Sequence, residues 1–227
     1  MWSCSKRQIY THSPLSTSHS PLILRKVLTL LKILLLADVA DKALWDYLNR
    51  DLLEGIELVL SCGDLPAPYL EFLTCFTNAP ILYIHGNHDK AYDYKPPEGC
   101  VCVEDMIYVH QGVRILGLGG SMRYGPSNHM YTEREMAKRV RKLWWPLWRN
   151  KGFDILLTHA PARGVGDQDD LPHRGFETFN QLMDRYHPKF MVHGHVHPQY
   201  GVLDFKRERQ YGETRVVNGY KRYVIEI

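Results

Sequence analysis

The stretch Ile81-Leu82-Tyr83-Ile84-His85-Gly86-Asn87-His88-Asp89 joins a short apolar run to a polar turn. A continuous apolar run of this length is typical of a strand buried on both faces. The glycine frees the backbone for a sharp turn, and the amide, imidazole and carboxylate after it bind metal ions and phosphate more readily than they fill a core. The stretch therefore predicts a buried strand that delivers polar side chains to the edge of a sheet.

Four further apolar runs also end in polar side chains, at Asp38, Asp64, His159 and the His195-x-His197 pair. Helical periods follow the first two runs, and this alternation of strand and helix predicts parallel strands joined by right-handed crossovers. Ligands bind at the carboxyl ends of the strands of such sheets. We therefore expect residues far apart in the sequence to meet in one crevice.

The remaining pattern adds strands and helices around these runs. The predicted strands are 33–37, 56–60, 81–84, 154–158 and 189–192, a hairpin of 106–109 with 113–118, and an antiparallel tail of 201–205 against 215–217 followed by 222–227. The predicted helices are 43–53, 69–77, 132–148 and 176–186. The third of these helices starts at the capping-box signature Thr132-x-x-Glu135, and Pro146 should kink or stop it.

Composition favours one domain in a reducing compartment. The chain has 227 residues, 44% hydrophobic, with a net charge of +3 that is too balanced to indicate a nucleic-acid binder. Its five cysteines are odd in number and contain no C-x-x-C, so we expect no disulfide framework and a cytoplasmic protein. Residues 22–37 are too short and too charged for a membrane span. We expect 1–31 to be a poorly ordered extension and 32–227 to be the domain.

The side chains expected at the sheet edge are carboxylates, an amide and imidazoles, without thiolates. This set of oxygen and nitrogen donors suits Mn²⁺, Fe or Zn²⁺. The donors are too numerous for one ion but fit two metals about 3.5 to 4 Å apart, an arrangement suited to in-line displacement at phosphorus. A thiolate site at Cys100 and Cys102 is the weaker alternative, because their alternation with valines is also what a strand face gives.

The ordered series Asp38, Gly63-Asp64, Gly86-Asn87-His88-Asp89, His159 and Gly194-His195-Val196-His197 resembles the calcineurin-like metallophosphoesterases over about residues 32–227. The resemblance implies an α/β fold, a β-sandwich of mixed sheets flanked by helices, with the site at the carboxyl ends of the strands. It implies two divalent ions, Mn²⁺ first, with Fe, Zn²⁺ or Ni²⁺ as alternatives. Asp64 would bridge them, with Asn87, His159 and His195 on one and Asp38 and His197 on the other. A metal-bridging hydroxide would attack a phosphodiester or phosphomonoester, while His88 assists the leaving group and Asp89 orients His88.

One position departs from the family pattern. The first motif reads Asp38-Val39-Ala40, where the family has Asp-x-His, and alanine cannot bind a metal. The second ion would therefore be held weakly, unless Asp41 supplies an oxygen. The simpler interpretation is that Asp41 caps the helix expected from Lys42. An alternative function follows from the same departure, namely a weakened or inactive scaffold of this fold that binds a protein partner.

The helix expected at 132–148 is rich in arginine, lysine and tryptophan. Such a mixture can bind single-stranded nucleic acid, which favours a nucleotide or nucleic acid as the substrate. The alternative is a cap helix that packs its Met136, Val140 and Trp144 stripe on the domain and leaves its basic face in solvent. Loop residues that could hold a substrate phosphate are Arg123, Arg163, His173 and Arg174. No membrane is expected as a partner, and the sequence does not identify a protein partner.

Overall fold

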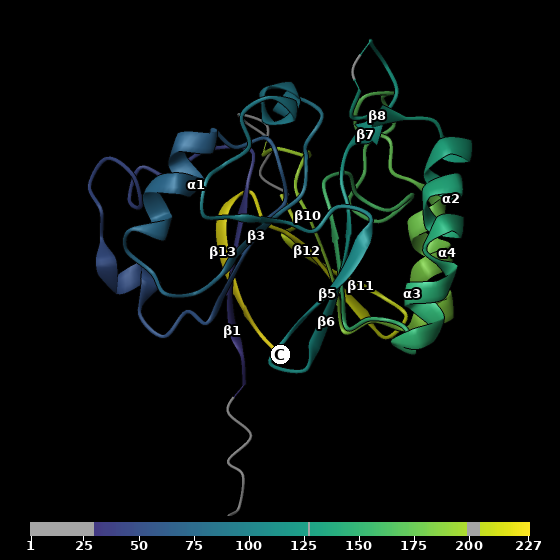
Figure 1. The fold of residues 1–227 in the computed structure, drawn as a ribbon. Coiled ribbons are helices and arrows are strands. Elements are labelled where there is room, and N and C mark those ends of the chain that lie inside the picture. Colours follow the sequence, from purple (N-terminus) through teal and green to yellow (C-terminus); the bar gives the residue numbers. More distant parts are fainter. Residues whose placement is uncertain (1–29, 127, 199–204) are drawn as a thin grey trace, which may run out of the picture.

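The computed structural model describes residues 30–126, 128–198 and 205–227 and contains two facing sheets with helices on their outer sides (Figure 1). The strands are β1 (Lys32–Ala37), β2 (Leu58–Ser61), β3 (Ile81–Tyr83), β4 (Val101–Cys102), β5 (Met106–His110), β6 (Val113–Leu118), β7 (Ser121–Met122), β8 (Met130–Tyr131), β9 (Ile155–Thr158), β10 (Phe190–His193), β11 (Glu208–Tyr211), β12 (Thr214–Asn218) and β13 (Lys221–Glu226). The first sheet has the order β13-β1-β2-β3-β4, and the second β11-β12-β10-β9-β6-β5. β7 and β8 form a separate pair.

Within each sheet, the strands that carry the predicted site run parallel to one another. β1 pairs in parallel with β2, and β2 with β3, while β9 pairs in parallel with β10. Antiparallel strands lie at sheet edges, with β13 beside β1 and β5 and β11 at the two ends of the second sheet. The predicted fold of mixed sheets is confirmed, and so is the hairpin of β5 with β6.

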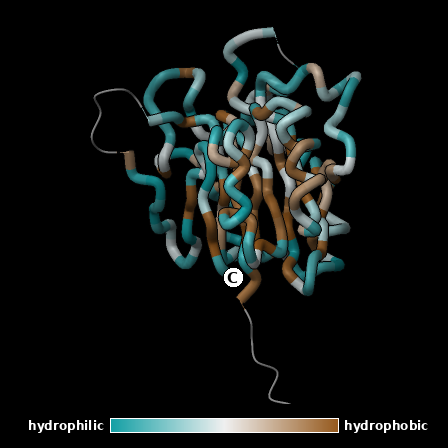
Figure 2. Tube along the Cα trace, turned by 90° about the vertical axis from the view of Figure 1, so that its left-hand side faces the viewer, coloured by the Kyte–Doolittle hydropathy of each residue, from teal (hydrophilic) through white to brown (hydrophobic). Residues whose placement is uncertain are grey.

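Alternation along the strands divides the apolar residues between two sides of each sheet. In β1, Ile33 and Leu35 enter the core between the sheets, whereas Leu34 and Leu36 face the outer layer. In β9, Leu157 lies in the inner core and Leu156 under the opposite outer layer. Because both faces are covered, these strands read as unbroken apolar runs. Figure 2 shows the same distribution, with hydrophobic strands inside and hydrophilic loops around them.

The helices supply the two outer layers. They are α1 (Ala67–Thr74), α2 (Glu133–Lys142), α3 (Trp144–Arg149) and α4 (Glu177–Tyr186). α1 packs Tyr69, Leu70 and Leu73 on the first sheet, while α2, α3 and α4 lie together over the second (Figure 1). The predicted capping box is present, since Thr132 and Glu135 exchange side-chain and backbone hydrogen bonds.

The prediction of a helix at 43–53 is wrong. Turns follow Asp41, Leu48 has a positive φ of 36°, and only a short 3-10 helix (Arg50–Leu53) forms. Trp45 instead stacks on Tyr69 of α1, with ring centroids 5.0 Å apart. Tertiary packing has therefore overridden the helical period in this segment.

The prediction of one basic and aromatic helix at 132–148 also needs correction. The helix breaks at Leu143, three residues before Pro146, and α3 begins a new phase. Met136 is fully buried, but Trp144 is 66% exposed, because Leu143 and Leu147 take the buried positions after the break. Arg139, expected on the solvated face, is buried.

The C-terminal pairing differs from the predicted tail. Residues 201–204 of that prediction lie outside the described part of the chain. β12 pairs antiparallel with β11 across a two-residue connection containing Gly212, and β13 leaves for the other sheet, where it pairs with β1. The proposed extension at 1–31 lies outside the described residues except for its last two. In the part of the chain that the structure describes, we find no helix with the length and apolarity that a bilayer crossing requires.

Candidate metal centre

The carboxyl ends of five strands, three from the first sheet and two from the second, bring the predicted polar side chains together. Asp38 follows β1, Asp64 follows β2 after Cys62-Gly63, and His159 follows β9 directly. Three of the residues at these ends, Asp38, Asp64 and His195, have φ values of 66°, 57° and 67°. Left-handed backbone at non-glycine residues is costly and concentrates at functional sites. The strand ends are therefore shaped for side-chain placement at the expense of local stability.

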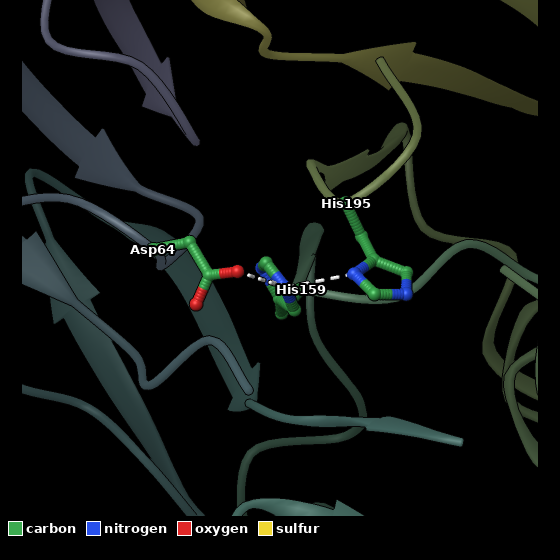
Figure 3. A group of neighbouring side chains, drawn as sticks. All are labelled: Asp64, His159 and His195. Carbon is green, nitrogen blue, oxygen red and sulfur yellow. Dashed lines mark hydrogen bonds and ion pairs between the residues drawn. The ribbon is translucent and has the colours of Figure 1, made fainter. Parts of the chain in front are cut away.

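Four donor atoms converge around the imidazole of His159. Its Nε2 lies 2.9 Å from Asn87 Oδ1 and 3.3 Å from Asp64 Oδ2. The same nitrogen lies 3.1 Å from His195 Nδ1. Figure 3 shows Asp64 and His195 on opposite sides of this ring. One amide oxygen, one carboxylate oxygen and two imidazole nitrogens thus surround one small volume.

Backbone carbonyls fix which ring nitrogens face that volume. His159 Nδ1 donates to the Cys62 carbonyl at 2.8 Å, and His195 Nε2 donates to the Pro172 carbonyl at 2.8 Å. His159 Nε2 and His195 Nδ1 are therefore turned inward. Such hydrogen bonds to the outer nitrogen are what orient metal-binding histidines.

The electrostatics of the cluster suit a cation. Burial disfavours a charged His159, but the Asp64 carboxylate outweighs it and raises the pKa of this imidazole to about 9. Burial, followed by the neighbouring His159, lowers the pKa of His195 to about 3, so His195 is neutral. For Asp64, burial opposes ionisation, yet His159 and the His88 amide hold its pKa well below the usual range. The positive charge of His159 is thus balanced by the Asp64 carboxylate.

The donor set fits a divalent ion. Two donors that bind one ion at about 2.1 Å lie roughly 3 Å apart, close to the spacing of these four atoms. The approach of the loops allows no larger residue at Gly86, where an added Cβ would lie 2.0 Å from Asp64 Oδ1. Gly194 has a similar role, since a Cβ there would lie 2.9 Å from Asp38 Oδ2.

The second expected group is less complete. Asp38 Oδ1 accepts the His195 amide at 2.9 Å and lies 3.3 Å from His197 Nε2. Asp38 Oδ2 is buried and has no hydrogen-bond partner among the described residues. A buried carboxylate oxygen without a partner is costly, and a bound cation would satisfy it. This group therefore also fits a metal ion, but with fewer protein ligands.

Asp41 and Ala40 do not complete the second group. Asp41 Oδ1 accepts the amide of Ala43 at 2.9 Å, and Asp41 Oδ2 pairs with Arg222 at 3.1 Å. Both oxygens of this carboxylate are thus engaged, in a turn rather than in the expected helix. Ala40 packs against the outer core of the first sheet.

In the loop Gly86–Asp89, the Asp89 carboxylate binds backbone amides. Asp89 Oδ2 accepts the amides of Asp64 and Gly86, each at 2.7 Å. Among the described residues no hydrogen bond joins Asp89 to the His88 ring, so orientation of His88 by Asp89 stays a prediction. His88 donates its amide to Asp64 Oδ1 at 2.8 Å, and its side chain is exposed.

The four predicted phosphate-binding residues have other contacts in this structure. Arg123 pairs with Glu135 at 2.9 Å and donates to the Met130 carbonyl. His173 pairs with Asp170 at 2.7 Å, although its ring centroid lies only 5.2 Å from that of His195. The remaining two are Arg163, which lies 3.9 Å from Asp167, and Arg174, whose Nη2 lies 3.5 Å from the Asp169 carbonyl. His173 is the member of this set that lies against a candidate ligand.

No sequence pattern signals Tyr124, which accepts a hydrogen bond from Asn87 Nδ2 at 2.9 Å. The carbonyls of Cys62 and Pro172 were missed as well, since a backbone acceptor has no residue type. Each of these contacts depends on how distant loops meet.

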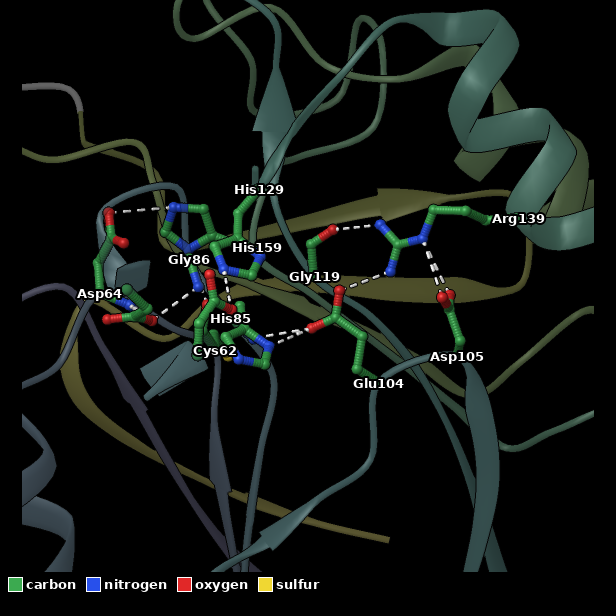
Figure 4. A network of polar contacts seen from close by, with 12 residues as sticks. Cys62, Asp64, His85, Gly86, Glu104, Asp105, Gly119, His129, Arg139 and His159 are labelled. Atoms are coloured by element: carbon green, nitrogen blue, oxygen red, sulfur yellow. Dashed lines mark hydrogen bonds and ion pairs between the residues drawn. The ribbon is translucent and has the colours of Figure 1, made fainter. Parts of the chain in front are cut away.

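A buried charge network lies beside the site loop (Figure 4). His85, which precedes Gly86, contacts Glu104 at 2.8 Å, and Glu104 pairs with Arg139 of α2 at 2.6 Å. Burial opposes ionisation of Glu104, but His85 and Arg139 outweigh it and lower its pKa to about 2. His85 also stacks on His129, which contacts Asp93. Because the two rings are nearly parallel, their in-plane lone pairs do not converge on one ion.

The comparisons with known proteins agree with this geometry. A family model described as calcineurin-like phosphoesterase matches residues 31–199. The UPF0046 proteins K07C11.7 and C25E10.12 of Caenorhabditis elegans are 26% identical over 151 residues and 28% over 136. These alignments cover 59% and 57% of this chain, and 51% and 43% of the relatives. The chain thus spans about half the length of the curated relatives it matches.

Solved structures share the fold at low sequence identity. TT1561 of Thermus thermophilus has a TM-score of 0.61 and 16% identity, covering 85% of this chain and 90% of its own. GAP50, described as the anchor in the inner membrane complex of Plasmodium, has a TM-score of 0.50 and 10% identity, covering 83% of this chain and 71% of its own. At these identities the likeness concerns the fold alone. The family model and the shared fold together establish that the chain belongs to the calcineurin-like phosphoesterase family.

Proposed function

We propose that this chain is a metal-dependent phosphoesterase that hydrolyses a phosphodiester or phosphomonoester, with Mn²⁺ as its preferred ion. The observation that carries the proposal is the convergence of inward donor atoms from Asp64, Asn87, His159 and His195 beside the exposed His88. Oxygen and nitrogen donors without thiolates suit Mn²⁺. The family membership supports the reaction class.

Two groups of side chains would hold two ions. Asp64, Asn87, His159 and His195 form the first group, and Asp38 and His197 form the second, with Asp64 shared. Divalent ions supply charge that neutralises phosphate oxygens, and they lower the pKa of bound water. The second ion would be held more weakly, because Ala40 contributes no ligand.

The chain's own residues position the substrate and move a proton. His88 is anchored by its amide to Asp64, while its imidazole is exposed and free to reach a leaving oxygen. An imidazole in this position can act as a general acid toward a leaving oxygen. Tyr124, held by Asn87, places an aromatic ring beside the centre, which supports a nucleotide or nucleic-acid ester as the substrate.

The proposal includes a cytoplasmic site of action. Cys62, Cys75, Cys100 and Cys102 are all free thiols, which supports a reducing compartment.

The test combines metal analysis with hydrolysis of bis-p-nitrophenyl phosphate and p-nitrophenyl phosphate in added Mn²⁺. We expect turnover that is lost in His159→Gln together with metal content. In His88→Ala, turnover should fall while metal content remains. His187→Asn is the matched control, because His187 is exposed at the end of α4 in a left-handed conformation that asparagine tolerates.

The alternative is the scaffold of the same fold, which Ala40 favours. Metal uptake without turnover, in the wild type and in His88→Ala alike, would favour the scaffold over the enzyme. Absence of both metal and turnover would remove the metal-dependent proposal altogether.

A further inference from the structure

A groove between α3 and α4 lies over the outer face of the second sheet, in the helical layer of Figure 1. Its apolar lining comes from all three helices of that layer and includes Ala137, Val140, Leu147 and Leu182. Trp144 and Trp148 also line it and are 66% and 68% exposed. We call this feature the tryptophan groove. Large aromatic side chains exposed beside an apolar floor are typical of an interaction surface.

The rim of the tryptophan groove carries positive charge only. Five basic side chains line it, and all five are exposed: Arg134, Arg141, Arg149, Lys151 and Arg185. None of the described residues that line the groove is acidic, and none of the five forms an ion pair within the described part of the chain. The charge of this rim is therefore not neutralised by the described chain.

The size and chemistry of the groove fit a peptide. Its volume is about 1130 Å³, just above the roughly 300 to 1,000 Å³ of small-molecule pockets. An aliphatic floor accepts the apolar face of an amphipathic segment, as in other helix-in-groove complexes. The rim would pair with carboxylates on the flanks of that segment.

The other candidate occupants fit less well. Single-stranded nucleic acid needs open aromatic faces for base stacking, but Trp148 already stacks on Trp145 with centroids 5.0 Å apart. The chain's own first 29 residues contain four lysines and arginines and no acidic residue, so their charge does not complement the rim.

We propose that the tryptophan groove binds an acidic amphipathic peptide segment of a partner protein, with apolar side chains on the floor and carboxylates on the basic rim. This surface is formed by the outer helices and contains none of the candidate metal ligands. It is therefore independent of the phosphoesterase proposal.

The test uses synthetic 16-residue helical peptides and tryptophan fluorescence with anisotropy. One peptide carries leucines on one face and glutamates on the other. A second replaces the glutamates by lysines, and a third replaces the leucines by serines. We expect saturable micromolar binding of the first peptide and at least tenfold weaker binding of the other two.

Charge reversal locates the site. Arg141→Glu with Arg149→Glu should weaken the leucine and glutamate peptide at least tenfold. Lys138→Glu with Lys142→Glu is the matched control, since these exposed lysines of α2 do not line the groove. Circular dichroism confirms that both variants fold.

Three outcomes would overturn the proposal. One is equal binding of the glutamate and lysine peptides. Another is equal weakening by both pairs of substitutions. The third is displacement of the acidic peptide by a 16-nucleotide oligothymidine that binds more tightly, which would assign the groove to nucleic acid instead.

Discussion

Replacing Arg139 by methionine should destabilise the folded protein by about 3 to 5 kcal/mol, the usual cost of leaving a buried charge without its partner. Arg139 donates to Glu104 at 2.6 Å, to Asp105 at 2.9 Å and to the Gly119 carbonyl at 2.8 Å. Its side chain is 10% exposed and that of Glu104 is 14% exposed. Methionine keeps much of the apolar stem, so the loss comes mainly from the stranded Glu104 carboxylate.

The same pair makes the effect depend on pH. The pKa of Glu104 is lowered from 4.5 to about 2 in the folded protein. A carboxyl with a lowered pKa contributes stability above its unfolded pKa and loses it as the pH falls through the folded value. Without Arg139, the folded pKa of Glu104 should rise. The difference between wild type and variant should therefore be full above about pH 4.5 and shrink toward pH 2.

Urea unfolding followed by far-UV circular dichroism measures this difference at neutral pH and at about pH 3. Arg141→Met is the control, because Arg141 is exposed on the same helix and should cost no more than about 0.5 kcal/mol. Adding Glu104→Gln to Arg139→Met should recover part of the loss, since the stranded charge is removed. Equal losses in Arg139→Met and Arg141→Met, or a loss that does not shrink at low pH, would refute the reasoning.

Three further predictions concern the metal centre. Tyr124→Phe removes an acceptor of the Asn87 amide, and we expect about tenfold weaker Mn²⁺ binding by calorimetry with an unchanged melting temperature; unchanged affinity would show that Tyr124 does not orient Asn87. Asp89→Ala leaves two backbone amides unpaired and should cost roughly 2 to 5 kcal/mol in urea unfolding, whereas Asp89→Asn keeps an acceptor and should cost less; equal costs would contradict this. Ala40→His should tighten the weaker of two Mn²⁺ binding events, and a titration identical to wild type would mean that the backbone does not turn the new imidazole inward.

Much of the fold was predictable because buried parallel strands have a local signature. The run Ile33 to Ala37 reads as a strand on its own, since both of its faces are covered. The polar residues after such runs were predictable for the same reason, because the carboxyl ends of parallel strands share one edge. Asp38 and Asp64 follow neighbouring strands of the first sheet and illustrate this rule. His159 follows β9 of the second sheet, so its contact with Asp64, 95 positions away, also depends on how the two sheets face each other.

The failures occurred where packing overrides local periodicity. The period of residues 43–53 is helical, yet Trp45 packs flat on Tyr69 and the segment forms turns. The helical pattern predicts that Arg139 faces solvent, but its side chain is buried and pairs with Glu104 and Asp105. No short-range pattern records such long-range partners.

The two halves of the candidate centre differ in how much the protein itself satisfies them. Around His159 every inward-facing donor atom has a polar neighbour, so this half is preorganised. The raised pKa of His159 keeps a proton at the place that a cation would occupy. Asp38 instead retains a buried oxygen without a partner among the described residues, next to the exposed His197. Ala40 provides no ligand, and Asp41 does not replace it, because its carboxylate pairs with Arg222. The asymmetry is therefore a property of the folded chain, because the Asp38 half leaves a buried oxygen unsatisfied by the described residues and the His159 half does not.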